Sequence, residues 1–420
     1  MQLSTERVIR PVTSWWASLS PVLSDATLYF VAGVFALLLG LTSSEPAQWH
    51  WGYISFTGYF LASLVLLIAS RWSTTFSLRK IVLVGLVVGV ILIPLGLETH
   101  WRQNNGGHGY AQPEVSVIER SAKNVVKGTD PYIVDVKHGK VMNSIRGLPT
   151  YESFFPYFPL MSIFGLPDAI THRFYGLTDA RIVMSLLTIA VGLVALRLFR
   201  AKREQKLRLA QVLFALPTGA LFLATGGDDM PILALMLLGV VALQRKQIYV
   251  SAVSIGIASA MKLTAWPMAL GALLTIRSKE FKGSLKQFAG VVGLILVATI
   301  LPFAIKAPHA FFANVFAFPL GLTSVTSPAA SALPGHILST WWHPFKHIVP
   351  AGALIIGGYF TASYLKQHWP ITLSKMLSLI GTCFVVLMSV SSATRFGYII
   401  YPINFYLWSW ASKEQPALSI

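Results

Sequence analysis

The sequence predicts an all-α, polytopic membrane protein. Of its 420 residues, 54% are hydrophobic and 12% are charged, whereas soluble domains carry about 25% charged residues. Several apolar stretches contain no charge over 17 residues or more, which is long enough to cross a hydrocarbon core about 30 Å thick. These stretches are continuously apolar rather than alternating, so we expect them to span as helices and not as barrel strands.

The first half of the chain contains six expected spans. In order they are Ala26–Thr42, Gly52–Ser70, Ile81–Leu97, Ala180–Leu196, Leu209–Thr225 and Met230–Leu243. The first span follows a mostly polar stretch and lacks a small-x-small cleavage site, so we expect it to be retained as an anchor.

The stretch Ile248–Ile276 fits either one long span or a tight hairpin around Lys262. One span would place the basic loop Arg277–Lys286 outside, whereas a hairpin returns it to the cytoplasm, where positive charge concentrates. We therefore expect a hairpin. Four more spans then complete a total of about twelve, at Gln287–Ile305, Ile348–Leu365, Ile371–Ser391 and Phe396–Ala411.

The connector Arg197–Arg208 sets the orientation, because it holds six basic residues in twelve and is therefore expected to be cytoplasmic. Both termini are then inside. A single integral-membrane domain over residues 1–420 would carry two extracytoplasmic segments, 98–179 and 307–347. The first has 82 residues, and connections of such length usually carry function.

Charge supports a site on the outer face of the cell membrane. Under this topology, 11 of the 16 acidic residues lie outside, namely Glu45, Glu98, Glu114, Glu119, Asp130, Asp135, Glu152, Asp168, Asp179, Asp228 and Asp229. The formal net charge of +17 is explained by cytoplasmic loops, so we expect no nucleic-acid partner. The single cysteine, Cys383, excludes an intrachain disulfide.

An amphipathic helix is expected at the start of the first external segment. From Pro113, which suits a first helical position, apolar residues recur at helical spacing until Gly128, which suits the residue after the last turn. Because the opposite face is basic, we expect this helix to lie on the membrane surface with its apolar stripe down.

Glu114 lies in the first turn of that helix, where unpaired N–H groups favour the ionised carboxylate. An ionised carboxylate can act as a base, although first-turn acids also simply complement the helix dipole. Further on, prolines interrupt the aromatic stretch Phe154–Leu160, which predicts a segment dipping into the interface. Tyr132, Tyr157 and Pro159 would line a groove for lipid or sugar there, or form part of an aromatic belt.

Several motifs resemble glycosyltransferase family 87. They are Glu114-Val-Ser-Val-Ile-Glu-Arg-Ser-Ala with Gly128-Thr-Asp-Pro-Tyr132, Phe155-x-Tyr157-x-Pro159, Gly227-Asp-Asp-Met-Pro231, Met261-Lys-Leu-Thr-Ala-Trp-Pro267 and Arg395-Phe-Gly-Tyr398. The resemblance implies the GT-C superfamily of polyprenyl-phosphate-sugar-dependent transferases, mostly actinobacterial. Its members include mannosyltransferases and an arabinosyltransferase.

The resemblance places the family's catalytic carboxylate, the general base, on Glu114. The family residue is usually aspartate, so glutamate would reach one methylene further. A Gly-Gln-x-Asn pattern common in the family is replaced here by Gly227-Asp228-Asp229-Met230. Asp228 or Asp229 could therefore share or take over the base role, or could hydrogen-bond sugar hydroxyls, or could form only a solvated turn.

The implied reaction moves a sugar, mannose being favoured by the family's commoner members, from a polyprenyl-phosphate donor to a lipid or glycan hydroxyl with inversion. Cations must hold the leaving phosphate, and Lys262 and Arg395 are the best candidates because charges within apolar runs are functional by default. Arg395 could instead snorkel at a span end. His336 could donate to phosphate or hydroxyl. We expect no metal or other cofactor, although paired aspartates would suit a divalent cation.

Two alternatives remain open. A secondary transporter would also suit about twelve helices with intramembrane charge, but such folds commonly contain two related halves, and the sequence has no internal repeat. A carrier of lipid-linked sugars without catalysis would fit if Glu114 were not the base. No Walker, Rossmann or His-x-Glu-x-x-His motif supports nucleotide or zinc chemistry.

Overall fold

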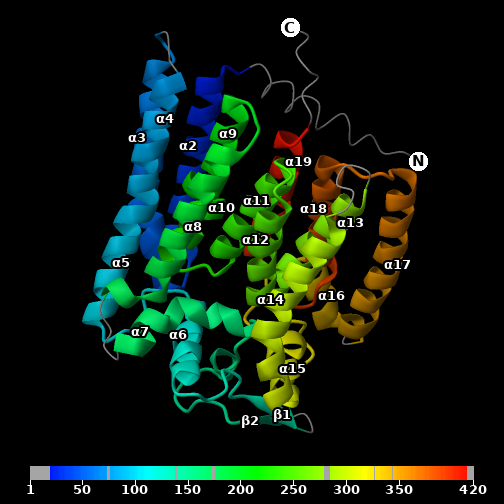
Figure 1. Ribbon diagram of the computed structural model, residues 1–420. Helices are drawn as coiled ribbons and strands as arrows, with labels where there is room; N and C mark the ends of the chain where they lie inside the picture. Colours follow the sequence, from blue (N-terminus) through cyan, green and yellow to red (C-terminus); the bar gives the residue numbers. More distant parts are fainter. Residues whose placement is uncertain are drawn as a thin grey trace. The chain divides into compact units, whose positions relative to one another are not determined.

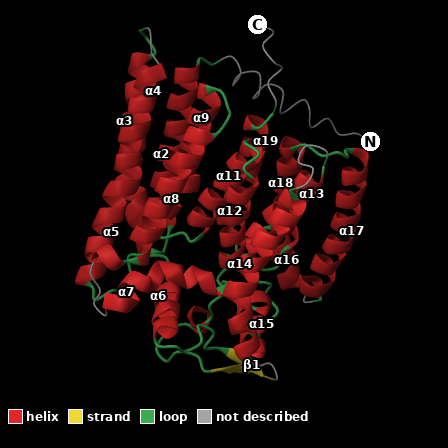
Figure 2. Ribbon diagram, in the orientation of Figure 1, coloured by secondary structure: helices red, strands yellow, loops and turns green. Residues whose placement is uncertain are grey.

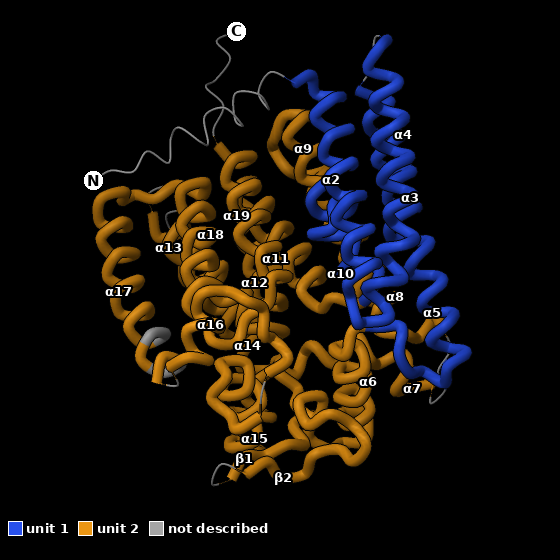
Figure 3. Tube along the Cα trace, turned by 180° about the vertical axis from the view of Figure 1, so that it is seen from behind, with its two compact units in different colours: residues 1–111, 211–225 blue, residues 112–210, 226–420 orange. Residues whose placement is uncertain are grey.

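The computed structural model describes residues 19–72, 76–137, 140–171, 176–278, 284–325, 327–342 and 344–413. Helices dominate, and the strands within these ranges form a single short hairpin (Figure 2). The all-α prediction is confirmed. The chain divides into two compact units, one of residues 1–111 and 211–225 and the other of residues 112–210 and 226–420 (Figure 3). That they act as one integral-membrane domain stays a prediction.

Seven helices in the described part of the chain are long and apolar enough to cross a membrane. They are Pro21–Thr42, Pro46–Ala69, Phe76–Asn104, Ala180–Leu198, Arg203–Thr225, Leu285–Lys306 and Leu373–Val390. Three shorter apolar helices lie at Asp229–Gln244, Ile248–Met261 and Leu263–Arg277. A multi-pass helical protein is therefore confirmed, and the larger number of spans stays a prediction.

The elements described in the first unit are all helices. In chain order these are α2 (Pro21–Thr42), α3 (Pro46–Ala69), α4 (Phe76–Val87), η1 (Val88–Leu92), α5 (Ile93–Asn104), η5 (Gln211–Ala215) and α10 (Pro217–Thr225). Helices α2 and α3 cross closely at a glycine, because a Cβ atom at Gly52 would lie 2.6 Å from the Ala36 carbonyl oxygen.

A π-helical turn joins α4 to α5 at a proline. Pro94 has no N–H to donate to the carbonyl of Val90 one turn earlier. The Trp51 indole Nε1 donates to that carbonyl instead, at 2.8 Å. The helix therefore continues unbroken to Asn104, seven residues beyond the expected end of the span at Leu97.

The segment that is predicted to be extracytoplasmic, called the external segment below, starts in the second unit with α6 (Pro113–Val126). A hairpin of β1 (Asp135–Lys137) and β2 (Lys140–Met142) follows, with Val136 paired to Val141 in antiparallel register. The remaining elements of the segment are η2 (Thr150–Ser153), η3 (Pro159–Gly165), α7 (Leu166–Thr171) and η4 (Gly176–Thr178).

The rest of the second unit is helical (Figure 1). Its elements are α8 (Ala180–Leu198), α9 (Arg203–Ala210), α11 (Asp229–Gln244), α12 (Ile248–Met261), η6 (Leu263–Ala265), α13 (Trp266–Arg277), α14 (Leu285–Lys306), α15 (Pro308–Phe312), η8 (Ala313–Ala317), α16 (Pro334–Trp341), α17 (Phe345–Gln367), α18 (Leu373–Val390), η9 (Phe396–Ile399) and α19 (Ile400–Ala411). Helix α11 forms the centre of this unit, since nearly all of its side chains are buried.

The predicted amphipathic helix is confirmed with its two end signals. Pro113 is its first residue, and Gly128 follows the C-cap residue Lys127 with a positive φ of 71°. We expected its apolar face to lie against the membrane surface. Instead, η3 covers this face. A Cβ atom at Gly165 of η3 would lie 2.8 Å from the Cα atom of Glu119, so the two backbones nearly touch.

The predicted break at Lys262 is also confirmed. Helix α12 ends at Met261, Lys262 is extended (φ −148°, ψ 141°), and α13 begins at Trp266. Two predictions fall partly outside the described residues. The cytoplasmic amino terminus concerns residues 1–18, and the basic loop Arg277–Lys286 includes residues 279–283.

Candidate active site

Glu114 forms an ion pair with Arg395, 281 residues further along the chain. The Glu114 side chain is 13% exposed, and its Oε1 atom accepts from the Arg395 guanidinium group. Its other oxygen, Oε2, is buried and has no hydrogen-bond partner among the described residues. A buried carboxylate oxygen without a partner is costly. The Glu114 carboxylate therefore has one oxygen bonded to Arg395 and a second oxygen available to accept a hydrogen bond.

The turn before α11 is packed directly against the helix that carries Glu114. Gly226 has a φ of 97°, which favours glycine, and a Cβ atom there would lie 2.3 Å from Val115 Cγ2 and 2.5 Å from Arg181 Cγ. Asp228 and Asp229 follow in this turn, and Asp229 is the first residue of α11. Their side chains are only 7% and 10% exposed. The solvated turn that the sequence left open is thus excluded.

Lys262 pairs with both aspartates. Its Nζ atom lies 2.8 Å from Asp228 Oδ2 and also donates to Asp229 Oδ1, and the lysine side chain is 11% exposed. The Phe158 N–H bonds the Met261 carbonyl at 3.0 Å, which holds the external segment against the break in the helix. The ammonium group also lies 5.5 Å from the centroid of the Tyr157 ring.

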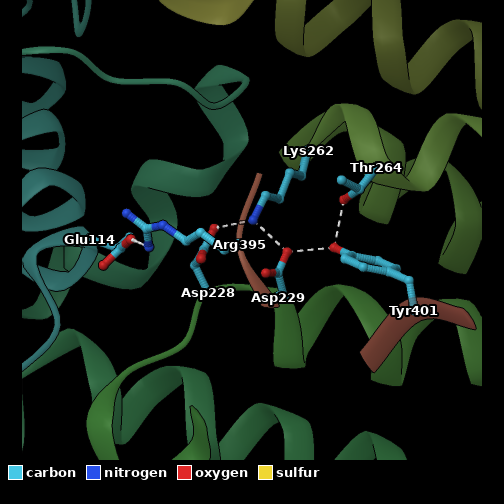
Figure 4. Close-up of polar contacts among 7 residues, drawn as sticks. All are labelled: Glu114, Asp228, Asp229, Lys262, Thr264, Arg395 and Tyr401. Carbon is cyan, nitrogen blue, oxygen red and sulfur yellow. Dashed lines mark hydrogen bonds and ion pairs between the residues drawn. The ribbon is translucent and has the colours of Figure 1, made fainter. Parts of the chain in front are cut away.

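Three further side chains extend this cluster, and two of them, Tyr401 and Thr264, are drawn in Figure 4. Tyr401 of α19 donates its hydroxyl to Asp229 Oδ1, and the Thr264 hydroxyl lies 2.6 Å from the Tyr401 oxygen. Tyr398, from the preceding 3₁₀ turn, places its ring 6.0 Å from the Lys262 ammonium group. None of the three was predicted as a site residue. Tyr398 and Thr264 lie within the motifs Arg395-Phe-Gly-Tyr398 and Met261-Lys-Leu-Thr-Ala-Trp-Pro267, whereas Tyr401 lies outside both.

His336 and the segment around it contact the backbone that precedes Arg395. Residues Ala330 and Thr394 form a parallel bridge, and His336 Nδ1 lies 2.8 Å from the Ser392 carbonyl oxygen. The described contact of His336 is therefore with the backbone that leads to Arg395. A role in phosphate binding stays a prediction.

The predicted aromatic groove is packed inside the protein. Tyr132 and Tyr157 are 3% and 4% exposed, and the Tyr132 hydroxyl donates to the Tyr157 carbonyl oxygen at 2.9 Å. Pro159 is buried at the start of η3. Of the three residues, Tyr157 borders the Glu114 to Lys262 cluster. Contact with lipid or sugar stays a prediction.

The model of glycosyltransferase family 87 matches residues 155–390, more than half of the sequence. The chain belongs to glycosyltransferase family 87. The predicted resemblance is therefore confirmed. No curated protein matches the sequence.

A solved structure was also found, the crystal structure of ArnT from Cupriavidus metallidurans bound to undecaprenyl phosphate. The likeness has a TM-score of 0.44 at 16% sequence identity, and it covers 78% of this chain. The chain spans 59% of the length of ArnT.

The candidate site of this family 87 protein combines residues from inside and outside the matched range. Asp228, Asp229 and Lys262 lie within residues 155–390, whereas Glu114 and Arg395 lie outside it. The ion pair that contains the predicted base therefore joins the two flanks of the matched region.

The site carries an excess of negative charge. It contains the carboxylates of Glu114, Asp228 and Asp229 but only two cationic groups, Lys262 and Arg395. Burial raises the pKa of Asp228, between α10 and α11, to about 6, and the nearby Asp229 and Glu114 add to the rise although Lys262 opposes it. Asp228 is thus the carboxylate of the site that is protonated under mildly acidic conditions.

The acidic residues of the site do not form a metal centre with other metal-binding side chains in the described structure. No group of three histidine, cysteine or acidic side chains suited to a metal ion occurs among the residues that the structure describes. Asp228 and Asp229 instead direct oxygens to the Lys262 ammonium group, which occupies the position between them. Independence from metals stays a prediction.

Proposed function

We propose that this protein is an inverting glycosyltransferase that moves mannose from a polyprenyl-phosphate carrier to a hydroxyl group of a lipid or glycan. Membership of glycosyltransferase family 87 supports sugar transfer. The polyprenyl-phosphate donor and mannose are what the family resemblance implies. The observation that carries the proposal within the site is the Glu114 carboxylate, held through Oε1 and unpartnered at Oε2.

In the proposed step, the acceptor hydroxyl oxygen attacks the anomeric carbon as the bond from that carbon to the phosphate oxygen breaks. Glu114 Oε2 takes the hydroxyl proton, and the phosphate leaves with the electron pair of the broken bond. Lys262 and Arg395 would stabilise the phosphate as its negative charge grows. Attack on the face opposite the phosphate inverts the anomeric configuration.

The outer face of the membrane is the proposed location of the site. Helices α8 and α11 both end near the basic connector, because the Arg245 guanidinium group after α11 bonds the Leu198 carbonyl oxygen at 2.9 Å. Asp228 lies at the opposite end of α11. If the connector is cytoplasmic, as its charge predicts, the candidate site faces the extracytoplasmic side.

Incubation of the purified chain with radiolabelled polyprenyl-phosphate sugars and a membrane lipid extract tests the proposal. We expect transfer of label from the mannosyl donor to a product whose mass identifies the acceptor. A Glu114→Gln variant should lose transfer, whereas Glu204→Gln, which removes an exposed carboxylate of α9, should not. Movement of solute into sealed vesicles without a new glycosidic bond would favour a transporter and contradict the proposal.

A further inference from the structure

The hydrogen bonds around Asp229 form a chain of side chains, and the backbone of residues 262–264 closes this chain into a ring. Lys262 and Tyr401 both donate to Asp229 Oδ1, and Tyr401 also contacts Thr264, two residues after Lys262. The short segment 262–264 therefore contacts both ends of the pair formed by Asp229 and Tyr401. This ring ties together the start of α11, the break between α12 and α13, and α19.

The direction of each hydrogen bond follows from the chemistry of the groups. An ionised carboxylate only accepts, so Tyr401 uses its single hydroxyl proton on Asp229. The Thr264 hydroxyl must then donate to the Tyr401 oxygen, 2.6 Å away. Such a chain of donors strengthens each bond in it, because each hydroxyl is polarised by the next.

Packing fixes the tyrosine ring in this position. Tyr401 is 0% exposed, and its ring stacks on Phe384 of α18 with centroids 4.8 Å apart and an interplanar angle of 9°. Its hydroxyl group therefore has little freedom to turn elsewhere. Asp229 is held by two donors, whereas Asp228 receives only Lys262 as a side-chain donor in the described structure.

We propose that Tyr401 and Thr264 are positioning residues that fix Asp229 and, through it, aim the Lys262 ammonium group at the phosphate of the donor. An ammonium group has three N–H donors, and the two aspartates use two of them. The third remains for a phosphate oxygen. This inference rests on the proposed function, because it takes Lys262 as a phosphate-binding group.

Binding of undecaprenyl phosphate to the purified full-length chain at one fixed pH tests this role directly. We expect Tyr401→Phe to weaken binding about tenfold, the size expected for a lost hydrogen bond to a charged group. Thr264→Val should act in the same direction, and Thr264→Ser, which restores the hydroxyl, should bind as the original chain does. The double variant Tyr401→Phe/Thr264→Val should bind no more weakly than Tyr401→Phe alone.

Tyr406→Phe is the matched control. Tyr406 lies on the same helix, and its hydroxyl contacts a threonine hydroxyl of α18, Thr382, at 2.9 Å in an exposed position. We expect this variant to bind undecaprenyl phosphate normally. Unchanged binding by Tyr401→Phe, an equal loss in Tyr406→Phe, or failure of Thr264→Ser to rescue would each overturn the inference.

Failure of the proposed function would be recognised separately. If the original chain binds undecaprenyl phosphate with the expected dependence on Tyr401 but transfers no sugar, the positioning role stands and the proposed transfer reaction fails. If sugar is transferred but the Tyr401 and Thr264 variants bind and react normally, only the positioning role fails.

Discussion

The two ion pairs of the candidate site differ in how completely they are satisfied. Lys262 lies between two carboxylates at 11% exposure, and one of these carboxylates is held again by Tyr401. Arg395 is 37% exposed and contacts a single carboxylate, Glu114, whose second oxygen has no partner in the described structure. A saturated network holds its groups in place, whereas a carboxylate with an unused acceptor can take a proton. In the proposed reaction, the Lys262 side therefore positions the donor phosphate and the Glu114 side takes the proton.

Replacing the base should have the largest effect on activity. Glu114→Gln keeps the shape of the side chain but removes its ability to take a proton, and general bases contribute about a hundredfold to ten-thousandfold in rate. We expect kcat for sugar transfer to fall by that amount while donor affinity changes little. Glu114→Asp should retain part of the activity, because the carboxylate is only one methylene shorter. Full activity of Glu114→Gln would remove the distinction between the two ion pairs.

Lys262→Met should have the largest effect on stability. It leaves two buried carboxylates without their shared cation, and removal of one partner from a buried pair costs about 3 to 5 kcal/mol. Arg395→Met should destabilise less, because it leaves one carboxylate without its cation rather than two and because Arg395 is itself partly exposed. Thermal unfolding of the detergent-solubilised variants measures both. Equal losses of stability in the two variants would show that the Lys262 and Arg395 ion pairs are equally satisfied, contrary to this comparison.

The packing between the turn that carries Asp228 and the helix that carries Glu114 can be tested at Gly226. Gly226→Ala places a side chain at a positive φ and against Val115 on the helix of Glu114. Replacing a positive-φ glycine by alanine in open space costs roughly 1 kcal/mol of stability, and Gly226→Ala should cost more than that. Gly128→Ala supplies that comparison, since its φ is 71° and no atom lies within 4 Å of its added Cβ. We expect the midpoint of thermal unfolding to fall further for Gly226→Ala. The reverse order would contradict the tight packing described at Gly226.

The smallest expected effect is a pH dependence of donor binding. Burial raises the pKa of Asp228 to about 6, so below that pH it is mostly protonated and above it mostly ionised. Protonation removes a negative charge beside the donor phosphate, so affinity should rise about threefold to tenfold as the pH falls through 6. A polyprenyl phosphodiester of mannose is the suitable probe, because its phosphate does not titrate in this range. Asp228→Asn should abolish the dependence, and an unchanged slope would exclude Asp228 as its source.

Features of the sequence that act locally predicted the fold well. Pro113 and Gly128 mark the ends of α6 because a missing N–H and a positive φ are tolerated only at specific helix positions. The break at Lys262 followed from the rule that basic loops face the cytoplasm. The covering of α6 by η3 could not be predicted, because lipid and protein are equally apolar surroundings for the same helix face.

The candidate site was predicted as separate residues rather than as pairs. Lys262 and Arg395 stood out as charges within or beside apolar sequence, and Glu114 as a first-turn acid on which the family resemblance places the base. Their partners could not be assigned, because the ion pair between Glu114 and Arg395 joins positions 281 residues apart. Tyr401 gave no signal at all, since a tyrosine in an apolar helix is equally compatible with packing and only its contact with Asp229 gives it a role.

The most direct test of the central claim is an experimental structure of the full chain with a polyprenyl-phosphate mannose bound. The account predicts phosphate oxygens in contact with Lys262 and Arg395, and the anomeric carbon placed so that an acceptor oxygen about 3 to 3.5 Å from it can also reach Glu114 Oε2. A sugar phosphate bound elsewhere, with the Glu114 carboxylate unable to reach the acceptor oxygen, would contradict it.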